Sequence, residues 1–206
     1  MTSGALERAV RRAAERGRAA AEHCELCGLD IPEEHRHLLD TTRAEVMCTC
    51  RACALLFDRD VASLGHFRLV PERRARLSGV SPQDLGVPVG LAFFVAQDSR
   101  HATVIAHYPS PMGATRWEVA PEAWSRAVSG CPQLADMAPE VEALLVNTAR
   151  GAEHRWLVPI DECYRLVAVV KNYWRGLSGG GRVWTEIDAY FDGLARRAHG
   201  RHGPAA

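Results

Sequence analysis

The chain has 206 residues, of which 47% are hydrophobic and 24% are charged. This composition supports one sizeable hydrophobic core plus a small additional module, and it excludes an intrinsically disordered chain. The 25 basic residues balance 25 acidic residues, so the sequence lacks the net positive field that draws proteins to nucleic acids or anionic membranes. We therefore do not expect a nucleic-acid partner.

Residues 1–23 are predicted to form an N-terminal helix, because Ala, Arg and Glu dominate this stretch. Charged residues interrupt it throughout, so it has no apolar segment of the kind that a secretory signal needs. The longest apolar run, residues 87–96, is far shorter than the roughly 20 residues that span a bilayer. We expect a cytoplasmic protein with no membrane span.

Residues 24–58 hold the strongest chemical signal, two Cys-x-x-Cys pairs made by Cys24 with Cys27 and by Cys50 with Cys53. Each pair suits a turn that points two thiolates at one metal ion, and four thiolates suit the tetrahedral site that zinc accepts. Four protein ligands leave no position for water, so this zinc would be structural. We predict a zinc-ribbon-like metal-binding module. Iron in a rubredoxin-like FeS4 centre is the alternative, because it uses the same paired spacing.

Three further residues of this module have side chains that bind metals, namely Cys48, His35 and His37. Cys48 precedes Cys50 by two residues, and residues two apart on an extended strand point to the same face. His35 and His37 are related in the same way. Two hypotheses stay open: a two-metal cluster, or Cys48 as a neighbouring thiol with both histidines facing solvent.

The cysteines also bear on the redox environment. Five of the seven lie between residues 24 and 53, so they make a poor disulfide framework. A reducing compartment with a thiolate metal site fits this distribution better.

Residues 59–86 contain many charged residues, prolines and glycines, and we predict a connector with a short helix at its centre. The sequence PERRAR at residues 71–76 looks like a basic patch. It has no interleaved aromatic residue that would stack on bases, so we interpret it as a solvated part of the connector.

Residues 87–206 are predicted to form an α+β domain. Short apolar runs rich in β-branched and aromatic residues indicate strands. These runs lie at residues 89–96, 103–108, 115–119, 141–148 and 154–160. The fourth run also fits a helix, and residues 121–130 fit a short helix between the third and fourth runs.

Two longer helices are predicted at the C-terminal end of this domain. Apolar residues recur at helical spacing between residues 161 and 174 and again between residues 184 and 198. Asp161 is placed to cap the first of these helices. Two helices packed on an antiparallel sheet define the α+β class.

The loop between these helices, GLSGGG at residues 176–181, matches the letters of the nucleophile elbow G-x-S-x-G. That elbow follows a strand, whereas a helix is predicted here, so we interpret the loop as a linker. An anion bound at the start of the following helix is the alternative. The sequence shows no set of acid, base and nucleophile, so we do not expect an enzyme.

Three stretches of the chain resemble an uncharacterised family of actinobacterial proteins: CELCGLDIPEEHRHLLD, CTCRACALLFD and CYRLVAVVKNYWRGLSGGGRVWTEIDAYFDGLARRA. The resemblance runs from about residue 20 to residue 198. The family is associated with gene clusters for high-affinity, oxygen-tolerant NiFe hydrogenases.

This resemblance implies a cytoplasmic, non-enzymatic accessory or maturation protein whose partners are hydrogenase subunits or assembly factors. Only the motif cysteines carry over as site residues, and none of them as catalytic. The alternatives are a rubredoxin-like iron electron carrier and a zinc-ribbon regulator that binds nucleic acid.

Overall fold

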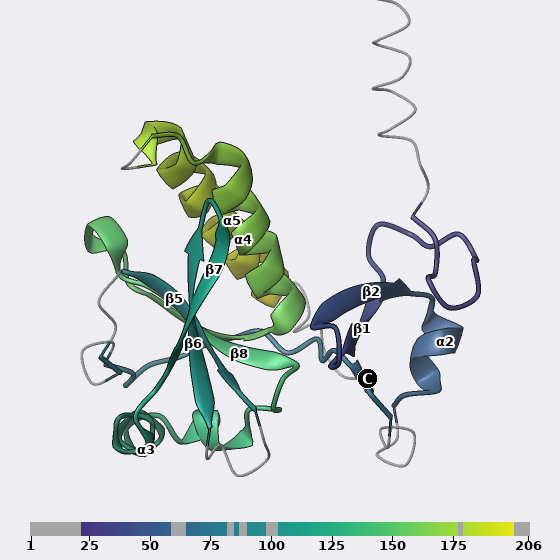
Figure 1. The fold of residues 1–206 in the computed structure, drawn as a ribbon, viewed down its shortest axis with the longest axis horizontal. Helices are drawn as coiled ribbons and strands as arrows, with labels where there is room; N and C mark the ends of the chain where they lie inside the picture. Colours follow the sequence, from purple (N-terminus) through teal and green to yellow (C-terminus); the bar gives the residue numbers. More distant parts are fainter. Residues whose placement is uncertain are drawn as a thin grey trace, which may run out of the picture. The chain divides into compact units, whose positions relative to one another are not determined.

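The computed structural model describes residues 22–58, 65–81, 85–86, 90–97, 103–176 and 179–199. The predicted N-terminal helix at residues 1–23 therefore lies outside the described residues, apart from its last two. The chain forms two compact units that divide between Leu69 and Val70 (Figure 1). Each unit is described by itself below.

The first unit is built on a three-stranded antiparallel sheet with strand order β2-β1-β3. Its elements are β1 (Arg36–Asp40), β2 (Glu45–Thr49), the short helix α2 (Arg51–Leu55) and β3 (Phe67–Leu69). Asp40 closes the turn between β1 and β2, because its Oδ1 accepts hydrogen bonds from the backbone N–H of Thr42 at 3.0 Å and from the Thr42 hydroxyl at 2.6 Å. The sequence after β2 leads directly into the helix that carries the second cysteine pair.

The second unit is built on a six-stranded antiparallel sheet with strand order β4-β9-β8-β5-β6-β7. Its strands are β4 (Ala75–Arg76), β5 (Leu91–Ala96), β6 (Val104–Ser110), β7 (Gly113–Glu118), β8 (Glu142–Asn147) and β9 (His154–Pro159). All five predicted strands are confirmed, and the run at 141–148 forms a strand, not a helix. The predicted α+β class is confirmed as well.

Helices cover both faces of this sheet (Figure 1). The helical elements of the second unit are α3 (Pro121–Gly130), the 3-10 helices η2 (Pro132–Asp136) and η3 (Ala149–Gly151), α4 (Ile160–Tyr173) and α5 (Gly180–His199). On one face, Phe94 of β5 packs near Trp124 of α3, with ring centroids 6.5 Å apart. On the other face, His154 of β9 stacks on Phe191 of α5 at 4.3 Å. The second unit therefore has three layers.

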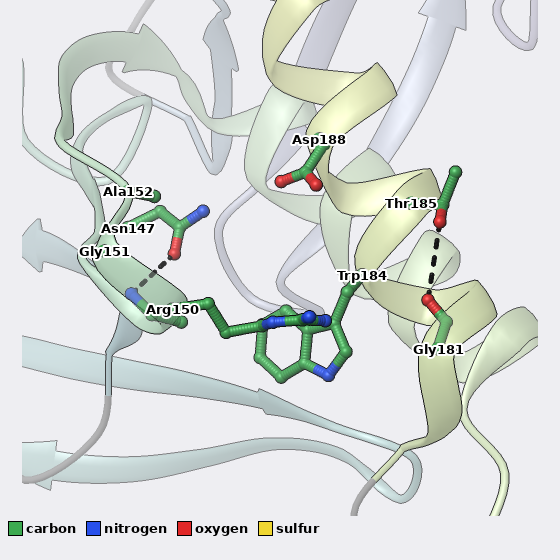
Figure 2. Close-up of a pocket in the computed structure, with 9 residues that line it drawn as sticks. Asn147, Arg150, Gly151, Ala152, Gly181, Trp184, Thr185 and Asp188 are labelled. Atoms are coloured by element: carbon green, nitrogen blue, oxygen red, sulfur yellow. Dashed lines mark hydrogen bonds between the residues drawn. The ribbon is translucent and has the colours of Figure 1, made fainter.

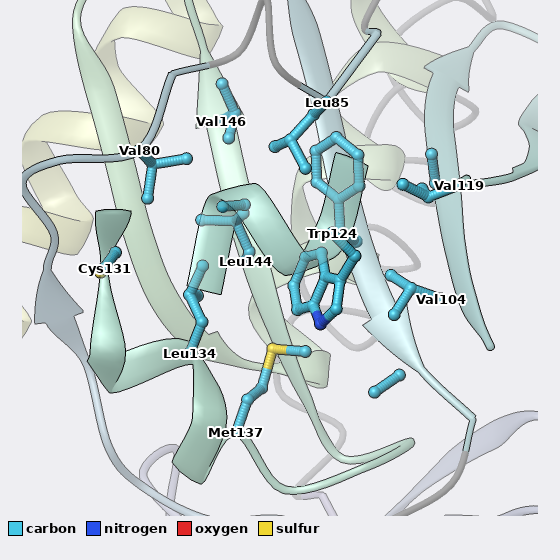
Figure 3. Close-up of a cluster of buried hydrophobic side chains, with 14 of the residues drawn as sticks. Val80, Leu85, Val104, Val119, Trp124, Cys131, Leu134, Met137, Leu144 and Val146 are labelled. Atoms are coloured by element: carbon cyan, nitrogen blue, oxygen red, sulfur yellow. The ribbon is translucent and has the colours of Figure 1, made fainter. Parts of the chain in front are cut away.

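The apolar runs in the sequence of β5 and β8 are unbroken because these two strands lie at the centre of the sheet. Every residue of β5 and of β8 is buried. A strand covered on both faces needs apolar side chains at successive positions and not only at alternate ones. Figure 3 shows the cluster on the α3 side, where Leu144 and Val146 of β8 meet Trp124 and Met137.

The prediction of a connector with a short helix at residues 59–86 is corrected by the structure. Its described part holds no helix, and it adds β3 to the first sheet and β4 to the second. The PERRAR segment is also more than a solvated patch. Arg73 binds the buried Glu142 through Nε at 3.0 Å and Nη2 at 2.6 Å. Its neighbour Arg74 binds Glu162, which is 0% exposed, at 2.9 Å.

The start of α4 differs from the prediction as well. Pro159 occupies the N-cap position and no side-chain hydrogen bond caps the helix. Asp161 lies inside the first turn, where a carboxylate interacts favourably with the positive end of the helix dipole. Cys163 is fully buried, as its place on the apolar stripe predicts.

Candidate metal centre

The first cysteine pair lies in a tight turn. The N–H of Gly28 donates to the carbonyl of Cys24 at 2.8 Å, and the N–H of Cys24 donates to the carbonyl of Leu29 at 2.7 Å. Gly28 has φ of 73°, a left-handed conformation that glycine adopts at little cost. This turn folds the backbone back on itself, so the sulfurs of Cys24 and Cys27 can face one ion.

The second cysteine pair lies at the start of a helix and not in an equivalent turn. Cys50 is the N-cap of α2, and its Sγ accepts a hydrogen bond from the N–H of Cys53 at 3.4 Å. An N–H···S bond of this kind stabilises the charge of a thiolate. The pair therefore differs from the prediction of two similar turns, although it presents both sulfurs to the same place.

The Sγ atoms of Cys24, Cys27, Cys50 and Cys53 all lie within 4.8 Å of one another. The sulfurs of Cys27 and Cys50 are 3.8 Å apart. A tetrahedron of four Zn–S bonds of about 2.3 Å has edges of about 3.8 Å, so a metal ion fits this cluster. Cys24 and Cys50 are buried, Cys53 is half-buried and Cys27 is exposed.

The electrostatics of the cluster also favour a cation. Burial alone would raise the pKa of Cys24, yet backbone N–H groups of Cys50, Cys27 and Leu26 lower that pKa to about 6. The sulfurs of Cys50 and Cys27 in turn raise the pKa of Cys53 to about 12, since nearby sulfurs cannot all carry negative charge at low cost. A bound cation would remove this repulsion and allow all four thiolates to form.

Cys48, His35 and His37 form a separate group in the same unit. Their ligand atoms lie within 4.8 Å of one another, and all three residues are half-buried. Cys48 and Cys50 were expected to share a face, but Cys50 leaves the strand to cap α2. The structure therefore assigns the sulfur of Cys48 to the histidine group and not to the four-cysteine cluster.

Four exposed leucines lie close to the ligand cysteines in the sequence. Among the described residues, the large apolar side chains with the greatest exposure include Leu26, Leu29, Leu55 and Leu56. Each lies within three residues of Cys27 or Cys53. Two of them, Leu55 and Leu56, are 61% and 66% exposed. These four residues therefore leave apolar side chains exposed on the two segments that carry the ligand cysteines.

The second unit contains a pocket of about 620 Å³ beside the first turns of α5 (Figure 2). Residues of η3 form one wall and residues of α5 form the other; those that line it are Asn147, Ala149, Arg150, Gly151, Ala152, Gly181, Trp184, Thr185 and Asp188. The guanidinium of Arg150 lies 5.7 Å from the centre of the Trp184 ring. The basic Arg150 and the acidic Asp188 both line this pocket, so the charges of its lining do not favour an anionic ligand over a cationic one.

The elements around the glycine-rich loop differ from those of a nucleophile elbow. The helix α4 precedes it, whereas such an elbow follows a strand. Ser178 lies outside the described residues. The interpretation of this loop as a linker between two helices agrees with the order of the elements.

A mixed α+β protein with a four-cysteine metal site is the class that the fold and the cluster define. The chain belongs to the family of unknown function DUF5947, whose model matches residues 23–198. This span includes both cysteine pairs and the whole six-stranded sheet. No curated protein and no solved structure matches the chain. Among the described helices, none is long and apolar enough to cross a membrane.

Proposed function

We propose that this protein is a non-enzymatic accessory or maturation factor of a NiFe hydrogenase. In this proposal the four cysteines hold a structural zinc ion, and the leucines beside them dock onto a hydrogenase subunit or assembly factor in the cytoplasm. The four-sulfur cluster is the observation that carries the metal-binding part of this proposal, since its sulfurs lie within 4.8 Å of one another.

A structural role for the metal is supported by the closed ligand set. Four thiolates complete a tetrahedral zinc site, so no position is left for water or substrate. The surrounding unit has little apolar core of its own. Among its described residues the buried apolar side chains besides cysteine are Ile31, Leu38, Leu39 and Ala54. Metal binding would supply the free energy that such a small core lacks.

A docking role is supported by the exposure of Leu55 and Leu56. Both follow Cys53 at the end of α2, so a metal ion at the cluster would hold them in place. Rigid apolar residues lose little entropy on binding, which favours a specific interface. The hydrogenase as partner is supported by the sequence resemblance alone, and it needs a direct test.

The test is co-purification from a host that makes the hydrogenase. The full chain should retain hydrogenase subunits or assembly factors, and Leu55→Ser with Leu56→Ser should lose them while metal content stays the same. Met112→Ser is a matched control, because Met112 is 95% exposed but lies in the second unit. Unchanged hydrogenase activity and cofactor content after deletion of the gene would refute the proposal.

Iron electron transfer is the second candidate function, and the exposure of Cys27 favours it. A ligand sulfur at the surface shortens the path for an electron to a partner. A ferric FeS4 centre absorbs visible light strongly, whereas a zinc site is colourless. The absorption spectrum and metal analysis of the purified protein therefore decide between the two candidates.

A further inference from the structure

The histidine group of the first unit has the geometry of a metal site. His37 of β1 and Cys48 of β2 are direct cross-strand partners, so their side chains project from the same face of the sheet. His35 precedes His37 by two residues, and the centres of the two rings are 4.7 Å apart. The ligand atoms of all three residues lie within 4.8 Å of one another.

The contacts of Nδ1 orient the His35 ring for metal binding through Nε2. Its Nδ1 lies 2.9 Å from the carbonyl oxygen of Pro32 and 3.3 Å from a carboxylate oxygen of Glu22. Both neighbours are acceptors, so in the neutral imidazole Nδ1 carries the hydrogen and Nε2 carries the lone pair. In metal-binding histidines, the N–H of the ring nitrogen that does not bind the metal commonly donates a hydrogen bond to a carbonyl or carboxylate in this way.

The Nε2 atom of His35 has no partner of its own. The side chain is only 6% exposed, and Nε2 is buried without a hydrogen bond to any described residue. A buried polar atom without a partner destabilises the folded chain, because its bond to water is lost and not replaced. A metal ion bound to this nitrogen, with His37 and Cys48 as further ligands, would satisfy it.

We propose that His35, His37 and Cys48 form a second metal site, separate from the four-cysteine cluster. Two imidazoles and one thiolate select a borderline divalent transition-metal ion of the zinc type, which includes Co²⁺ and Ni²⁺. Three protein ligands leave the fourth tetrahedral position open. With one ligand fewer, the second site should release its metal to solution more readily than the four-cysteine cluster.

Equilibrium titration of the full-length protein with Co²⁺ or Zn²⁺ tests this site. The wild type should bind two equivalents, and a mild chelator should remove one of them first. His37→Gln and Cys48→Ser should each lose that weaker equivalent and keep the tight one. His66→Gln is the matched control, since His66 is an exposed histidine of the same unit and belongs to neither group. It should bind both equivalents.

A single equivalent in the wild type would overturn the proposal, as would a second equivalent that survives in both variants. A measurement without substitutions covers the case in which a variant does not fold. In a wild-type NMR titration with Zn²⁺, the Nε2 resonance of His35 should shift between the first and second equivalents. If the histidine resonances stay in place across that range, the second site does not exist.

Discussion

The two units of this protein differ in the interactions that stabilise them. The second unit surrounds its sheet with helices, and its central strands are buried along their whole length. Among the largest fully buried side chains of the described chain, only Leu38 belongs to the first unit. The first unit instead gathers cysteines where the second gathers leucine, valine and phenylalanine. A metal–thiolate cluster can replace a core when the chain segment is too short to build one.

This difference can be measured because the two units have different probes. All five tryptophans lie in the second unit, so tryptophan fluorescence reports on that unit alone. Co²⁺ absorption or bound-metal analysis reports on the first unit. Each substitution or treatment described below is expected to change the signal of one probe and leave the signal of the other unchanged.

Removal of the metal should have the largest effect. Structural zinc contributes on the order of 10 kcal/mol or more to the folding of small metal-bound modules. A strong chelator, or Cys24→Ser, should therefore unfold the first unit and leave the second one folded. Hydrogen exchange should show lost protection in β1 and β2 and unchanged protection in β5 and β8. Full protection of β1 in metal-free protein would show that the first unit folds by its apolar core.

Loss of the buried ion pairs should have the next largest effect, and only on the second unit. Glu162 is 0% exposed and binds Arg74 at 2.9 Å and Arg197 at 2.9 Å. Glu162→Ala leaves these two arginines without their partner, which costs about 3 to 5 kcal/mol. Denaturation followed by tryptophan fluorescence should show this loss, with metal content unchanged.

Glu186→Ala is the matched control for this prediction. Glu186 is 34% exposed and pairs at 3.7 Å with Arg182, which is 75% exposed. Exposed pairs of this type contribute roughly 0.5 kcal/mol or less. Equal destabilisation by both substitutions would mean that burial does not strengthen the Glu162 network.

These ion pairs could not be predicted from the sequence. Arg73 and Glu142 are 69 residues apart, and Arg74 and Glu162 are 88 residues apart. No local pattern connects such residues, so PERRAR looked like a solvated patch. The short strands β3 and β4 were missed for a similar reason, because their pairing partners lie in distant segments.

Local patterns were sufficient for the cysteine cluster and for the longer strands. The Cys-x-x-Cys spacing brings two sulfurs together within one turn, and this geometry depends only on nearby residues. The apolar run of β5 predicts a buried strand for the same reason, whereas the run of β8 also fitted a helix and only the structure decided between the two. The buried Nε2 of His35 could not be foreseen, since its burial depends on how the ring packs in the folded unit and not on a sequence pattern.

Acid should weaken the second unit through His107. Burial, together with the nearby Arg116, lowers the pKa of His107 from 6.5 to about 4. The unfolded chain then binds the proton more tightly between these values, so stability is complete above about pH 6.5 and falls as the pH drops to about 4. A loss of about 2 to 3 kcal/mol is expected, after allowance for partial exposure.

His107→Gln tests this pH dependence, because glutamine does not titrate. The ring of His107 stacks on Phe93 at 4.7 Å, so the variant is less stable at neutral pH, but its stability should fall less between pH 6.5 and pH 4. The comparison of the two pH profiles cancels contributions from His154 and the carboxylates. Parallel profiles would assign the acid sensitivity to those other groups.

A turn residue should give the smallest effect, and it links folding to metal affinity. Ala44 has φ of 54° in the turn between β1 and β2, which costs a residue with a Cβ about 1 kcal/mol. Glycine removes that strain and loses part of the gain to entropy, so Ala44→Gly should stabilise the first unit by about 0.5 kcal/mol. Because folding and metal binding are coupled in this unit, zinc should bind about twofold more tightly.

Arg150→Gly provides the comparison, because Arg150 has a similar φ of 56° in the second unit. It relieves the same kind of backbone strain, but far from any metal ligand in the sequence. Competition with a chelator of known affinity should detect tighter zinc binding for Ala44→Gly and none for Arg150→Gly. If neither substitution changes the zinc affinity, the first unit is already folded before metal binds, and its stability does not depend on the cluster.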